Sequence, residues 1–147
     1  MKEIFKESVL VNSSAEDTWY YFIQFQNAKD WMPGVSEMRV PLDSLPLKKG
    51  SIIEATIKGN KQRSTVVEYE AEKSITLRSV VGHFQADYTY QFQQEDNQAR
   101  VTLVATCEAH GFVTKIIALP IRNMIKKQDA GQLEKFKTAC ESRTRNA

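Results

Sequence analysis

From Ser51 to Cys107, apolar and polar residues alternate along the chain with few interruptions. A period of two is typical of β-strands that bury one face and expose the other. Because turn-forming residues separate the alternating segments, the pattern predicts an antiparallel meander with one apolar face. The predicted turns are residues 59–61, 72–74 and 95–97.

The spacing of apolar residues changes after Gly111, where it becomes helical and stays so to about residue 143. Pro120 is expected to kink or restart this helix, because proline cannot continue the hydrogen bonding of a helix interior. A sheet with one apolar face needs a cover, and this is the longest helical segment. We therefore expect the final helix to lie across the sheet.

The first fifty residues are predicted to contain a strand, two helices, a second strand and a loop. Ser13 or Ser14 precedes Glu16 in the pattern of a capping box, so a helix should begin there and carry the aromatic residues that follow. Proline and glycine at positions 33 and 34 should end the second, shorter helix. The predicted segments are strand 2–11, a helix over 15–25, a short helix at 27–31, strand 35–40 and loop 41–50.

The composition is that of one ordinary globular domain spanning residues 1–147, with 41% hydrophobic and 26% charged residues. The sequence has no apolar run of membrane-spanning length, and Glu3 and Glu7 interrupt the apolar segment that a signal peptide needs. We therefore expect a cytoplasmic protein with no stable membrane insertion. The net charge of +2 is too balanced for a dedicated nucleic-acid binder.

Cofactor and metal sites are not expected. Cys107 and Cys140 lack the spacing of a zinc site or a disulfide framework, and both are predicted to be small buried residues. His83 and His110 have no metal-ligand neighbours, and the six glycines form no phosphate-binding loop.

Basic residues gather at the C-terminal end of the chain. Residues 112–147 contain eight basic and three acidic side chains, which leaves a net charge of +5 there. Such a basic helix face is either a solvated surface or a contact for an anionic ligand, a membrane surface or a partner.

A curved sheet around a helix leaves space where large and small inward residues alternate, as they do at Phe84, Ala86 and Tyr88. This space is predicted to be an apolar pocket for a small hydrophobic or amphipathic ligand. The residues predicted to form it are Trp31, Met38, Ile53, Leu77, Ser79, Phe84, Tyr88, Tyr90, Leu103, Ala105, Cys107, Phe112 and Ile116.

Two pairs of these residues allow more than one role. Tyr88 and Tyr90 could orient a ligand through their hydroxyl groups or simply pack in the core. Trp31 and Met38 could pack at the rim or form an adaptable lid.

No catalytic residue is predicted. Both histidines fall at strand ends or on the outward side of the alternation. Arg78, Asp87 and Glu108 are also outward, where they should be solvated or form cross-strand ion pairs.

The arrangement resembles the polyketide cyclase/dehydrase and lipid-transport branch of the START-like (SRPBCC, Bet v 1-like) superfamily. The resemblance is carried by residues 31–35 after the two helices, by Gly50, Gly111 and Pro120, and by residues 133–141. It implies an α+β helix-grip fold, in which a curved antiparallel sheet of six or seven strands wraps around a long C-terminal helix. Two short helices follow strand 1, and a deep hydrophobic cavity is expected.

This resemblance leaves three functions open. The first is binding or transport of a small hydrophobic ligand, such as a lipid, a polyketide or another aromatic or isoprenoid molecule. The second is a cyclase/dehydrase-like (aromatase/cyclase) enzyme that folds a reactive polyketone in the cavity. The third is a co-chaperone or ribosome-associated interaction module that uses the basic helix face. The residues favour binding, because no acid–base pair is predicted to point inward.

Overall fold

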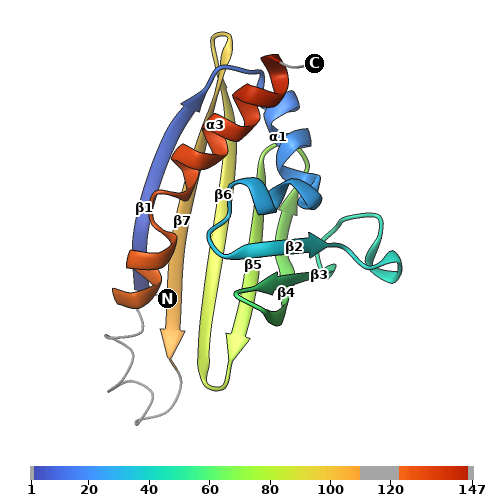
Figure 1. The fold of residues 1–147 in the computed structure, drawn as a ribbon, viewed down its shortest axis with the longest axis vertical. Coiled ribbons are helices and arrows are strands. Elements are labelled where there is room, and N and C mark those ends of the chain that lie inside the picture. The colour runs from blue at the N-terminus through green and yellow to red at the C-terminus, as the bar shows by residue number, and fades with distance from the viewer. Residues whose placement is uncertain (1, 110–122, 146–147) are drawn as a thin grey trace.

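A computed structural model describes residues 2–109 and 123–145 of the protein. Seven strands form one antiparallel sheet in the order β1-β7-β6-β5-β4-β3-β2, and helices cover one of its faces (Figure 1). This confirms the predicted α+β helix-grip fold. The elements are β1 (Lys2–Val11), α1 (Ala15–Ile23), η1 (Phe25–Asp30), β2 (Val35–Arg39), η2 (Leu42–Ser44), β3 (Ile52–Ile57), β4 (Asn60–Glu70), β5 (Ser74–Val81), β6 (Phe84–Glu95), β7 (Gln98–Ala109) and α3 (Gln132–Arg145).

The strands β3 to β7 form the predicted meander, in which each strand pairs with the next. Leu77 lies opposite Tyr88, and Tyr88 lies opposite Ala105, so the inward residues of three strands share one row. β1 pairs with β7 and thereby brings the N-terminal strand to the edge beside the end of the meander.

Helix α1 begins where the capping pattern places it. The Ser14 backbone is extended, and its side-chain oxygen accepts a hydrogen bond from the Asp17 backbone N–H at 3.1 Å. Glu16 and Asp17 place negative charge in the first turn, which favours the positive end of the helix dipole.

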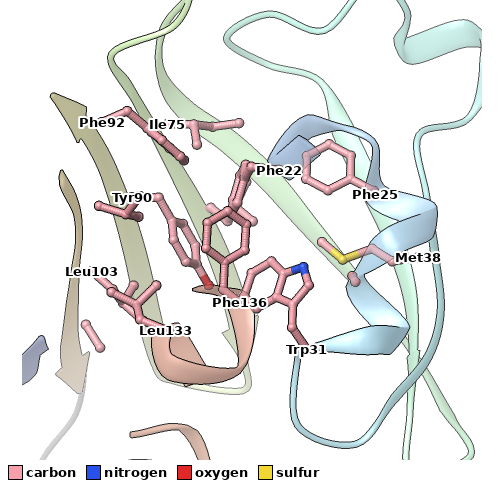
Figure 2. Packing of buried hydrophobic residues seen from close by; sticks show 14 of the residues in the cluster. Phe22, Phe25, Trp31, Met38, Ile75, Tyr90, Phe92, Leu103, Leu133 and Phe136 are labelled. Atoms are coloured by element: carbon pink, nitrogen blue, oxygen red, sulfur yellow. The ribbon is translucent and has the colours of Figure 1, made fainter. Parts of the chain in front are cut away.

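Aromatic side chains from α1, η1, β6 and α3 fill part of the space between the sheet and the helices (Figure 2). The ring centroids of Phe22 and Tyr90 are 4.6 Å apart, and those of Trp31 and Phe136 are 4.9 Å apart. All four residues are at most 2% exposed. This cluster joins the two short helices to α3 and forms a tightly packed, buried core.

The C-terminal helical segment is interrupted, which corrects the expectation of one helix over residues 112–143. Residues 123–129 are helical, a turn follows at Ala130 and Gly131, and α3 then begins. Gly131 adopts φ +91°, a left-handed conformation that suits glycine because it has no Cβ. Pro120, where a kink was expected, lies outside the described residues.

A carboxylate from β1 binds this interruption. Glu7 accepts hydrogen bonds from the backbone N–H groups of Gly131 at 2.7 Å and Leu133 at 3.1 Å. It therefore satisfies donors that the start of α3 leaves without intrahelical partners, and its charge suits the helix dipole.

Further along, two more polar contacts hold α3 to the last part of β1 and to Asn12, which follows it. The Lys137 ammonium donates to the Leu10 carbonyl oxygen at 2.9 Å, and the Asn12 backbone N–H donates to the Glu141 carboxylate at 2.8 Å. Lys137 also pairs with Glu141. Lys137 therefore attaches the helix to the edge strand, whereas the sequence pattern groups it with the cations of the basic face.

Replacing Glu7 by alanine should lower the free energy of unfolding by about 1–3 kcal/mol, because two charge-assisted hydrogen bonds at the start of α3 are lost. Urea denaturation measures this change. Lys6→Ala is the matched control, since Lys6 is the exposed neighbour on the same strand. An equal effect of both substitutions would contradict a specific role for Glu7.

Candidate functional site

A cavity of about 430 Å³ lies between the inner face of β2–β6 and the helical segment before α3. Its wall is mainly apolar and includes Val35, Ala55, Ile57, Ala86 and Ile125. Met124, on the helical side, is 58% exposed and lies where the wall meets solvent. A volume of this size is within the range of sites for small molecules.

Six of the thirteen residues predicted from the sequence line this cavity. They come from β2, β5 and β6, and their side chains face the space between sheet and helix. They are Met38, Leu77, Ser79, Phe84, Tyr88 and Tyr90.

Five others do not line this cavity and are buried in the packed core. Because α3 runs along β1, the inward residues of the neighbouring strand β7 belong to the packed part of the molecule. The cavity therefore lies farther toward β3 and β5 than predicted. The five core residues are Trp31, Ile53, Leu103, Ala105 and Cys107, whereas Phe112 and Ile116 lie outside the described residues.

One end of the cavity is polar, and its groups form a connected set. The Tyr88 hydroxyl donates a hydrogen bond to the Asp129 carboxylate. The Tyr90 hydroxyl donates to Gln132 Oε1 at 2.8 Å, and Gln132 Nε2 donates to the Asp129 backbone carbonyl oxygen at 3.1 Å. We call these four residues the polar end. They connect β6 to the two sides of the helix interruption.

Burial raises the pKa of both phenols, and the Asp129 charge raises them further. Burial also raises the pKa of the Asp129 carboxyl, although the Tyr88 hydroxyl and the Lys58 charge offset part of this effect. A phenol holds its proton more tightly than a carboxyl group, so Tyr88 is the donor of the shared hydrogen bond.

Asp129, Gln132 and Glu7 were not predicted as site residues. The helical spacing of apolar residues dominates the pattern over residues 112–143, and it assigns no role to the acidic Asp129. Glu7 lies two residues from both Phe5 and Val9, so its side chain points to the same inner face of the sheet as theirs. A carboxylate at such an inward, otherwise apolar position is the sequence signal that could have identified Glu7.

Charged side chains on the outer face of the sheet form a cross-strand ion pair. Arg78 binds Asp87 through two hydrogen bonds of 2.8 and 2.9 Å, which confirms the cross-strand ion pair. Together with Thr76 and Thr89 they line an open groove on the outer face of β4–β6, opposite the cavity. His83 is exposed, and His110 lies outside the described residues.

Within the described ranges, no cluster of three or more His, Cys, Asp or Glu side chains is arranged to hold a metal ion. None of the helices described here has the length and apolarity needed to cross a membrane.

Asp129→Asn should change the pH dependence of stability. The pKa of Asp129 is higher in the folded than in the unfolded protein. The contribution of this group to the free energy of unfolding is therefore fully present below the unfolded-state pKa and is lost as pH rises through the folded-state pKa. The asparagine can still accept the Tyr88 hydrogen bond but does not titrate. The variant should therefore gain stability relative to the parent as pH rises above the ordinary aspartate range.

Urea denaturation between acidic and neutral pH measures this gain. Glu134→Gln is the control, because Glu134 is an exposed carboxylate on α3. A constant offset between Asp129→Asn and the parent at every pH would argue against burial of the charge.

Comparison with known proteins gives a family match over most of the chain. A family model described as polyketide cyclase/dehydrase and lipid transport matches residues 2–141. No curated protein sequence matches the chain significantly.

Solved structures share the fold at low sequence identity. The di-domain ARO/CYC BexL from the BE-7585A biosynthetic pathway has a TM-score of 0.74 and 16% identity, covering 96% of this chain and 47% of that protein. The di-domain ARO/CYC StfQ from the steffimycin biosynthetic pathway has a TM-score of 0.71 and 14% identity, covering 95% of this chain and 51% of that protein. A START superfamily protein from Mycobacterium smegmatis has a TM-score of 0.65 and 17% identity, with 97% of each chain covered. This chain therefore spans about half the length of the two di-domain proteins.

Proposed function

We propose that this chain, which belongs to the polyketide cyclase/dehydrase and lipid transport family, binds a small hydrophobic or amphipathic molecule in its internal cavity. The observation that carries the proposal is the cavity itself, which has a mainly apolar wall and a connected polar end. Its likeness to START superfamily and ARO/CYC structures supports the same general role.

The cavity's chemistry suits an amphipathic ligand. Apolar side chains from strands and helix surround most of the volume, and burial of each ligand methylene group there contributes about 0.8 kcal/mol before the costs of binding. A few convergent polar groups then fix the ligand's orientation. Tyr88 and Tyr90 have this role in the proposal, although their hydroxyls act together with Asp129 and Gln132.

The neutral fluorescent probe N-phenyl-1-naphthylamine should bind with a stoichiometry of one per chain. Ser79→Trp should weaken this binding at least tenfold, because Ser79 lines the cavity and an indole would occupy the space. Val80→Trp is the matched control, since the adjacent Val80 is 62% exposed. Fluorescence titration measures both, with circular dichroism to verify folding.

If both tryptophan variants bind the probe as the parent does, the ligand is not held in this cavity. The same conclusion follows if the probe does not saturate the folded parent protein.

A cyclase/dehydrase-like activity is a second candidate, favoured by the Tyr88–Asp129 pair. Ring closure of a polyketone begins when a base removes a proton from the carbon next to a carbonyl group. Asp129 is a carboxylate beside an apolar wall, and burial raises its pKa toward the range that suits a general base. The sequence did not predict this inward carboxylate.

Enolisation of the bicyclic ketone 2-tetralone in D₂O separates the two candidates. An enzyme using Asp129 should accelerate deuterium incorporation at the carbons beside the carbonyl, and Asp129→Asn should slow it at least tenfold. Proton NMR follows the exchange, with Glu134→Gln as the control. Equal rates with parent and Asp129→Asn would leave binding as the function.

The interaction-module hypothesis has less support. Lys126, Lys127 and Lys135 are exposed, but Lys137 is engaged by β1 and Glu141. For location we propose the cytoplasm, because Cys107 and Cys140 are buried thiols, as is common in reducing compartments.

A further inference from the structure

We propose that the polar end of the cavity selects ligands that donate a hydrogen bond, through a hydroxyl or an ammonium group, and discriminates against carboxylates and simple ketones. This inference rests on the proposed binding function and specifies the chemical class of its ligand. It is carried by the directions of the hydrogen bonds that join Tyr88, Tyr90, Asp129 and Gln132.

The protons of the polar end are already used within the protein. Tyr88 and Tyr90 each have one hydroxyl proton, and both protons are donated to side chains of the helical segment. One amide proton of Gln132 is donated to a backbone carbonyl oxygen. The phenol oxygens and the Asp129 carboxylate can therefore only accept further hydrogen bonds from a ligand.

Electrostatics favour the same ligands. Among the described residues, no Lys, Arg or His nitrogen lies within 4.0 Å of the Asp129 carboxylate. Lys58 is exposed and acts on Asp129 only through the longer-range field. A ligand carboxylate placed here would add a like charge in a poorly solvated space, whereas an ammonium group would supply a counter-charge in direct contact.

The remaining hydrogen-bond donors of the cavity are neutral and would bind a ligand's acceptor group only weakly. Gln62 and Gln128 also line the cavity, and Gln132 has a second amide proton, but all three amides are neutral. The hydroxyls of Ser64 and Ser79 lie on the strand wall and share one hydrogen bond of 3.0 Å, so only one neutral hydroxyl proton of this pair remains for a ligand. A ketone oxygen at the polar end would thus face the Asp129 carboxylate without a charged donor to compensate.

The test is displacement of bound N-phenyl-1-naphthylamine by four ten-carbon probes, each kept below its micelle concentration or its solubility limit. The probes are 1-decanol, decylammonium, decanoate and 2-decanone, which share a chain length and differ in the polar group. We expect 1-decanol and decylammonium to displace the reporter at concentrations at least tenfold lower than decanoate. 1-Decanol should also bind several-fold more tightly than 2-decanone.

Two variants identify the group responsible. Asp129→Asn keeps an acceptor for Tyr88 but removes the charge, so decylammonium should lose at least tenfold in affinity and decanoate should gain. Glu134→Gln removes the same charge from the exposed face of α3 and should leave all four affinities unchanged.

The outcomes distinguish this inference from the function on which it rests. Saturable reporter binding with decanoate or 2-decanone equal to or tighter than 1-decanol overturns the inference and leaves the binding function in place. Unchanged probe ranking in Asp129→Asn also overturns it. Failure of the folded parent to bind the reporter and all four probes overturns both.

Discussion

The Glu7 carboxylate at the helix interruption is the contact on which the arrangement of the site depends. It binds the Gly131 and Leu133 N–H groups and so fixes where the helical segment turns. Asp129 lies just before this turn and Gln132 just after it, so each meets one tyrosine of β6. This charge on the edge strand thereby helps to determine which groups face the ligand space, although Glu7 is outside the cavity lining.

The same attachment divides the inner face of the sheet into two parts. Because α3 lies along β1, the aromatic cluster of Phe22, Trp31, Tyr90 and Phe136 closes the part nearest α3 and α1 (Figure 2). The part near β3 and β5 is bordered, among the described residues, by the shorter helical segment and by Met32 and Pro33 before β2, and there the space remains. Tyr90 borders both parts, since it packs in the cluster and its hydroxyl reaches Gln132.

The sheet was predictable from the sequence because side chains alternate strictly with period two, and Ser14 showed the start of α1 through its capping chemistry. The position of the cavity was less predictable, because it depends on which strand the last helix follows. That choice is made by contacts of Glu7, Lys137 and Glu141 between segments far apart in sequence. Periodicity indicates which way a side chain points but not which distant group it contacts. The contact between Asp129 and Tyr88 therefore could not be predicted from it.

β1 pairs with β7 and contacts α3, so it depends on segments that are synthesised much later. Contacts between Glu7 and Gly131, or between Asn12 and Glu141, join residues 124 and 129 positions apart. During synthesis, β1 emerges before β7, and within the described sheet it has no neighbouring strand until residues 98–109 have been translated. Until then its apolar side chains and open edge are available to chaperones or to other nascent chains. Closure of the sheet is therefore a late, non-local event, of the kind that makes folding slow.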